Sequence, residues 1–370
     1  MDYIPIAQPY IGEEEADAVY RQAKSGWISM GRKVEELEKL ICEYTGVKFA
    51  VAMSNGTATL HAALMALGVG NGDEVVLPTL TYISSANAVL YCGAIPVFCE
   101  VDPQTFNVTT ETIRSVVTDR TKVVMPVDLK GQPADFDEIN LLAKEFGIKV
   151  LSDSAESFGA IYKGSKVGTQ CRVHSFSFFA NKNVTMGEGG VITTNDSDLA
   201  HKCRVIRNQG QSERYVHVMI GHNYRLTDLA AAFGVEQIKR VDWIMEEKGR
   251  IAAFYNNAFK GHPLIKTPYL PDYADRPSWY MYCLSFADNV NRDNVIRAMH
   301  ERGVDHRLSF PPVHLQPIYR EMFGFKEGNY PISEKTFNNF IDVPCWVGMT
   351  DEQMRKVVDV TIEAVEKCQE

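Results

Sequence analysis

The chain has 370 residues, 45% of them hydrophobic and 23% charged, which is enough for a sizeable core and more than one domain. Its 38 Lys and Arg residues against 47 Asp and Glu residues give a formal net charge of −9, and the sequence has no basic stripe or tail. We therefore do not expect nucleic acid as the main partner. There is no long apolar run and no signal-peptide pattern, so we expect a cytoplasmic protein without a membrane-bound part.

The first predicted elements are a proline-interrupted arm at residues 4–10, a helix from about Glu13 and a second helix over residues 32–44. A strand at residues 49–53 then leads through a small-residue turn into another helix. The free N–H groups and the dipole of such a helix start favour an anion, so Gly56 and Thr57 are candidates to hold a phosphate. Ordinary strand-to-helix turns have the same composition, and that alternative stays open.

Alternating strands and helices follow, with strands expected at residues 72–78, 95–100, 122–129 and 149–153, and helices near residues 109–117 and 136–146. This alternation predicts a mainly parallel sheet covered on both faces, with ligands at the carboxyl ends of the strands. No Gly-x-Gly-x-x-Gly follows any of these strands, which excludes a dinucleotide-binding fold. Tyr82, just beyond one strand, is either a core tyrosine or an aromatic plate for a flat cofactor.

Asp153 ends the strand at residues 149–153, where a buried carboxylate is costly unless a cation accompanies it. A protonated ring nitrogen would supply that cation, whereas the alternative role for Asp153 is a helix N-cap. The eight cysteines are scattered, and even Cys92 and Cys99 lack the spacing of zinc ligands or a redox motif. Free thiols and no metal site are therefore expected.

Lys182 lies between an apolar strand at residues 175–179 and the turn Gly187-Glu188-Gly189-Gly190. Desolvation at such a position would lower the pKa of Lys182 and free its amine to act as a nucleophile or Schiff-base partner. The alternative is a surface lysine in a loop. The hydroxyl of Ser177, five residues earlier, could cap its own backbone.

Further along, Arg225 belongs to a Gly-x-Asn-Tyr-Arg-x-Thr motif at residues 221–227, and its guanidinium suits a carboxylate or phosphate. One long helix is predicted over residues 228–259, with a domain boundary inside it near Val241, and a strand is predicted at residues 279–286. The expected division is a large domain, residues 1–240, that includes the N-terminal arm, and a smaller C-terminal α/β domain, residues 241–370.

Together these motifs resemble the DegT/DnrJ/EryC1/StrS family of sugar aminotransferases, which are pyridoxal phosphate enzymes of fold type I. The similarity runs from Ile4 to the end of the chain. It implies an α/β fold with a mainly parallel sheet in the large domain, pyridoxal 5'-phosphate as the cofactor, and a homodimer with shared active sites.

The resemblance also implies roles for individual residues. Lys182 would join the cofactor and carry the proton, Asp153 would face the ring nitrogen, and Tyr82 would stack on the ring. The remaining implied positions are Gly56, Thr57 and Ser177 at the phosphate, Glu156 near the 3′ oxygen, Asn223 at the phosphate of the neighbouring subunit, and Arg225, Arg307 and His314 toward the substrate. For His314, a buried structural histidine is the alternative.

Glutamate as amino donor and a nucleotide-linked 4-keto-6-deoxy sugar as acceptor are likewise implied by the resemblance. The lysine segment is most similar to the perosamine-synthase branch, which aminates C4. Asp128 and Lys130 depart from the His and Tyr that relatives mostly carry, and we expect them to change the charge and shape near the cofactor. This departure leaves open another keto-sugar or a smaller phosphorylated ketone as acceptor. The family also includes a sugar dehydratase variant with histidine at the position of Lys182. This chain keeps the lysine, which argues against a dehydratase. A non-enzymatic regulator is the second alternative.

Overall fold

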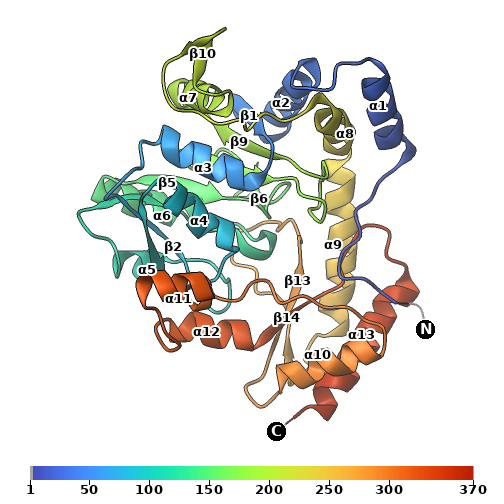
Figure 1. Ribbon diagram of the computed structural model, residues 1–370. Helices are drawn as coiled ribbons and strands as arrows, with labels where there is room; N and C mark the ends of the chain where they lie inside the picture. The colour runs from blue at the N-terminus through green and yellow to red at the C-terminus, as the bar shows by residue number, and fades with distance from the viewer. Residues whose placement is uncertain (1–2, 370) are drawn as a thin grey trace.

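A computed structural model describes residues 3–369, and Figure 1 shows a large α/β part joined by one long helix to a smaller part. Among the described residues, seven strands form the large sheet in the order β1-β9-β8-β5-β4-β2-β3. β8, β5, β4, β2 and β3 pair in parallel, whereas β9 is antiparallel to both β8 and β1. The mainly parallel sheet predicted from the sequence is confirmed. Its strands are β1 (Phe49–Met53), β2 (Glu74–Pro78), β3 (Ile95–Cys99), β4 (Thr121–Val124), β5 (Lys149–Asp153), β8 (Val173–Ser177) and β9 (Gly190–Thr194).

Alternation along the strands divides the apolar residues between the two faces of this sheet. Ala50 and Ala52 of β1 belong to a core with the helices α2, α6 and α8, while Val51 and Met53 belong to a second core with α3, α4 and α7. The helices of this part are α1 (Glu13–Lys24), α2 (Arg32–Thr45), α3 (Gly56–Ala66), α4 (Ile83–Tyr91), α5 (Thr110–Arg114), α6 (Phe136–Phe146), α7 (Ser197–Arg207) and α8 (Asp228–Lys239). Two short hairpins, β6 (Ile161–Tyr162) with β7 (Ser165–Lys166) and β10 (Gln211–Glu213) with β11 (Val216–His217), are added to it.

The single helix predicted over residues 228–259 is wrong, because the chain breaks at Arg240 between α8 and α9 (Val241–Ala258). The Arg240 side chain reaches α1, where its Nε donates to the Glu15 carboxylate at 2.8 Å. α9 is the long helix that joins the two parts in Figure 1. Its first residues pack in the core with α2 and its later ones, from Ile251, in a C-terminal core. The domain boundary near Val241 stays a prediction.

The C-terminal part is built on a small antiparallel sheet of β12 (Ile265–Lys266), β13 (Tyr282–Phe286) and β14 (Phe340–Val343). Its helices are α10 (Arg292–Glu301), α11 (Pro317–Phe323), α12 (Pro331–Asn338) and α13 (Asp351–Lys367). The N-terminal arm, which the sequence analysis grouped with the large domain, packs here: Ile4 bridges to Val304, and Trp346 Nε1 donates to the carbonyl of Pro5 at 2.9 Å. Within residues 3–369 no helix combines the length and the apolar character that crossing a membrane requires.

Candidate active site

A cavity of about 610 Å³ opens at the carboxyl ends of β5 and β8, where the sequence predicts the ligand. Seven of the predicted residues line it together: Gly56, Thr57, Tyr82, Asp153, Glu156, Ser177 and Lys182. Arg307 lines it from the C-terminal part. The cavity therefore brings the expected cofactor positions and a cation from the other half of the chain into one space.

The start of α3 forms the end of the cavity suited to an anion. Asn55 caps the helix, and its side chain accepts from the Ala58 N–H at 2.8 Å. The N–H groups of the first helical residues, Gly56 and Thr57, have no partner within a helix, so they are available to an anion there. A Cβ at Gly56 would lie 2.9 Å from that of Ser177, so only glycine allows β8 to approach the turn this closely. The local structure fits a phosphate.

Asp153, at the end of β5, supplies a buried carboxylate to the middle of the cavity. Its oxygens accept from Ser85 Oγ at 2.7 Å and from the Ala155 N–H at 3.2 Å. Burial raises the pKa of Asp153 despite these hydrogen bonds and the charge of Lys182. A turn, and no helix, follows Asp153, so the N-cap alternative does not apply. A protonated ring nitrogen would fit beside this carboxylate.

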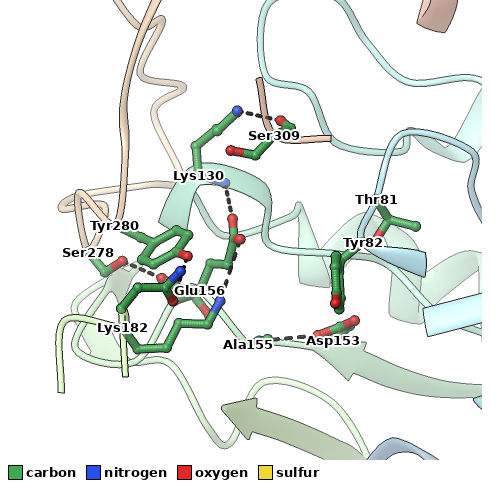
Figure 2. A network of polar contacts seen from close by, with 12 residues as sticks. Thr81, Tyr82, Lys130, Asp153, Ala155, Glu156, Lys182, Ser278, Tyr280 and Ser309 are labelled. Atoms are coloured by element: carbon green, nitrogen blue, oxygen red, sulfur yellow. Dashed lines mark hydrogen bonds and ion pairs between the residues drawn. The ribbon is translucent and has the colours of Figure 1, made fainter. Parts of the chain in front are cut away.

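Tyr82 stands across from Asp153 in Figure 2. Its side chain is 55% exposed, which excludes the alternative of a core tyrosine, and its ring lies 5.1 Å from that of Phe310. Both rings line the cavity, so they offer an apolar surface to a flat ligand.

Lys182 lies inside the cavity with its side chain 13% exposed, which excludes a lysine out in solvent. Its Nζ is 3.5 Å from Glu156 Oε1 and 4.1 Å from the centre of the Tyr280 ring. Burial alone would lower the pKa of Lys182, but Tyr280, Glu156 and Asp153 outweigh it and the pKa is raised. The lowered pKa expected from the sequence is therefore wrong for the protein alone, because desolvation is only one of the influences on this amine.

Tyr280 is a residue of the site that sequence reasoning missed. It lies just before β13, and its hydroxyl donates to Asn181 Oδ1 at 3.1 Å and accepts from Arg307 Nη1 at 3.3 Å. The predicted strand at residues 279–286 placed it in an aromatic run with no sign of which ring faces the ligand. Only the packing of the C-terminal part against the sheet brings this ring to Lys182.

Asn223 and Arg225 are not in the cavity that contains Lys182. Asn223 is exposed and forms a backbone bridge to Asn208. Arg225 donates to Asn208 Oδ1 at 2.8 Å and lines a second hollow of about 440 Å³. Glu188 lines both spaces, so the hollow adjoins the cavity.

His314 is fully buried and takes the structural alternative. Its Nδ1 is 2.6 Å from Thr79 Oγ1 and its Nε2 is 2.9 Å from Glu334, so both ring nitrogens are occupied. Burial lowers the pKa of His314. The imidazole does not line the cavity, contrary to the expectation that it contacts the substrate.

The charges of Asp128 and Lys130 do not enter the cavity either, contrary to the expectation that they alter its chemistry directly. Asp128 is fully buried and accepts from Ser157 Oγ at 2.6 Å and Ser154 Oγ at 2.9 Å. The Lys130 side chain runs away from Lys182 (Figure 2). Only Leu129, between them, lines the cavity.

Residues 9–361 match the DegT/DnrJ/EryC1/StrS aminotransferase family. The chain belongs to this family. The aminotransferase is 39% identical to the GDP-perosamine synthase of Caulobacter vibrioides over 96% of each chain. Among solved structures it resembles DesV of S. venezuelae, with a TM-score of 0.94, 30% identity and coverage of 98% of this chain and 99% of that one. The pyridoxal phosphate form of a putative sugar aminotransferase from Streptococcus pneumoniae gives a TM-score of 0.93 at 28% identity, with both chains covered completely.

These findings confirm the family, the fold and the enzyme class predicted from the sequence. The protein is a pyridoxal-phosphate-dependent sugar aminotransferase. The residues present fit that cofactor, since an anion-binding helix start, a buried carboxylate and a cavity lysine share one space. The family also implies that the enzyme acts on a sugar substrate and uses an amino donor.

Proposed function

We propose that this aminotransferase moves the amino group of glutamate to C4 of a nucleotide-linked 4-keto-6-deoxy sugar. The likeness to GDP-perosamine synthase along nearly the whole chain supports this acceptor. The observation that carries the chemistry is Lys182 inside the cavity, 3.5 Å from the Glu156 carboxylate and close to Asp153. A buried amine beside carboxylates, inside a cavity, can exchange a proton with a bound substrate.

Each residue of the site then has a role. Bound pyridoxal phosphate supplies an electron sink for negative charge at the substrate carbon. Asp153 keeps a proton on the ring nitrogen, and Lys182 holds the cofactor at rest and moves the proton at the reacting carbon. Arg307 presents a cation to the carboxylate of the donor or the diphosphate of the acceptor. Gly56, Thr57 and Ser177 hold the phosphate.

The alternative of a smaller phosphorylated ketone rested on Asp128 and Lys130. Their side chains lie outside the cavity, so no observation of the site favours that acceptor over a nucleotide-linked sugar. A cytoplasmic location remains a prediction from the sequence.

We also propose a homodimer whose active sites are completed across the interface. Asn223 and Arg225 lie outside the Lys182 cavity of their own chain, beside a hollow that adjoins it. Large apolar side chains are exposed at residues 215–220, on and after the hairpin that projects at the top of Figure 1, and Ile220 is 84% exposed. Such a surface is typical of an interface.

The acceptor is tested by supplying the cofactor-loaded enzyme with glutamate and a panel of keto-sugars. The panel contains 4-keto-6-deoxy and 3-keto sugars linked to GDP, dTDP or UDP, and small phosphorylated ketones. We expect 2-oxoglutarate and an amino sugar of matching mass from a nucleotide-linked 4-keto sugar. Turnover confined to 3-keto sugars or to the small ketones would contradict the proposal.

A further inference from the structure

Lys130 is tied to the catalytic lysine through its backbone. It lies in the turn after β4 with φ 62°, a left-handed conformation that non-glycine residues rarely adopt. In this conformation its N–H donates to Glu156 Oε2 at 2.8 Å, while the other oxygen of Glu156 is 3.5 Å from Lys182 Nζ. The backbone of Lys130 therefore holds the carboxylate that faces Lys182.

The side chain of Lys130 extends in the opposite direction, into the C-terminal part (Figure 2). Its Nζ donates to the carbonyl of Ser309 at 2.6 Å and to Asp342 Oδ2 at 2.8 Å, and it lies 4.2 Å from the centre of the Phe340 ring. The Lys130 side chain is 6% exposed and that of Asp342 is 0% exposed. A buried ion pair of this kind is costly to desolvate, and loss of one partner strongly destabilises the protein. The pair therefore fixes the geometry of the two segments that it joins.

The Lys130–Asp342 pair connects the turn after β4 to the wall of the cavity that carries Arg307. The backbones of Arg307 and Asp342 exchange hydrogen bonds of 2.9 and 3.1 Å, and Ser309 Oγ donates to Asp342 Oδ2 at 2.6 Å. Arg307 and Phe310, at the two ends of this segment, both line the cavity. We name residues 307–310 the acceptor wall.

We propose that Lys130 is a positioning residue that fixes the acceptor wall relative to Lys182 and so helps to select the sugar acceptor. Lys130 bonds Glu156 through its backbone and the acceptor wall through its side chain. Displacement of the acceptor wall would therefore also displace Glu156, and the reverse. Three donors on a long stem let a lysine satisfy a carbonyl and a carboxylate together. The assignment of the wall to the acceptor rests on the proposed function.

The test uses the double variant Lys130→Met/Asp342→Asn, which removes the ion pair without leaving a buried charge unpaired and retains the backbone N–H at position 130. With the loaded enzyme, we expect the glutamate half-reaction, followed by the cofactor spectrum, to stay within about threefold of the parent rate. We expect the KM for the keto-sugar, and its Kd measured by calorimetry without an amino donor, to rise about tenfold. Equal losses in both half-reactions, or no change in either constant, would overturn the inference.

A second measurement does not depend on the acceptor. Amide hydrogen exchange of residues 307–310 is expected to be at least about tenfold faster in the double variant. The matched control is Lys122→Met, since Lys122 also donates to a carbonyl, that of Gly68, and to an aspartate, Asp73, but lies away from the cavity. This control should leave exchange and acceptor constants unchanged. A parent inactive on every nucleotide-linked keto-sugar would refute the proposed function, while unchanged exchange at the acceptor wall would refute the role of Lys130.

Discussion

Lys182 lies among groups that retain its proton, because Tyr280 and the carboxylates of Glu156 and Asp153 raise its pKa. We expect Lys182→Ala to reduce transamination by at least about 10³-fold, since this variant lacks the residue that we propose holds the cofactor and moves the proton. Borohydride treatment followed by peptide mass spectrometry should place the cofactor on Lys182 in the parent and on no residue of the variant. Lys163→Ala, a change to a half-exposed lysine paired with Asp137, should match the parent in both measurements.

Asp128 gives the protein a pH-dependent stability that is independent of the reaction. Burial raises the pKa of Asp128 to about 7 from its ordinary value of 3.8, so between these values the native state binds a proton that the unfolded state has released. This contribution to the free energy of unfolding is complete below pH 3.8 and falls as the pH rises to about 7, by up to about 1.4 kcal/mol per pH unit. Denaturant titrations at pH 5 and pH 7 should show a smaller fall for Asp128→Asn than for the parent. An identical fall in both proteins would contradict the assignment.

At the scale of elements, the junction of β1 with α3 depends on a residue without a side chain. A methyl group at Gly56 would meet Ser177 at 2.9 Å and push β8 away from the anion site. We expect Gly56→Ala to weaken cofactor binding at least about tenfold, measured by absorbance titration of the apoprotein. Gly249→Ala is the control, because no atom lies within 4 Å of the added methyl in α9. It should leave cofactor binding unchanged and stabilise the fold by about 0.5–1 kcal/mol.

Elements with local boundary signals were predictable from the sequence. The helix at residues 136–146 was found with both ends, since Gly147 adopts the left-handed conformation that stops it. The break at Arg240 was missed because the apolar pattern continues through it. Arg240 contacts α1 more than 200 positions away in the chain, which no local pattern indicates. The strand that ends at Ser177 was placed two residues too late.

The candidate site shows the same contrast between residues that the local sequence marks and residues that depend on distant contacts. Lys182, Asp153 and Gly56 stand beside strand ends or turns that the sequence marks, and in the structure all three line one cavity. Tyr280 and the side-chain contacts of Lys130 could not be predicted, because they arise only where the C-terminal part docks on the sheet.

At the scale of the whole molecule, the proposed dimer makes a prediction about mixed subunits. Alone, Lys182→Ala and Asn223→Ala chains should each be nearly inactive. When the two are coexpressed in equal amounts, a heterodimer would contain one site with both Lys182 and Asn223 intact, and about a quarter of the parent activity should return. Sedimentation analysis should show dimers in every sample. Absence of recovery in verified heterodimers would contradict sharing of the sites.

The arm that packs beside Val304 joins segments that lie far apart along the polypeptide. The Ile6 N–H donates to the Asp305 carboxylate across a separation of 299 positions. During synthesis this arm must therefore wait until residues 303–305 have been made before it can pack against them. A change within this arm, such as an inserted tag, would therefore disturb the packing of Val304 and Trp346 in the C-terminal part.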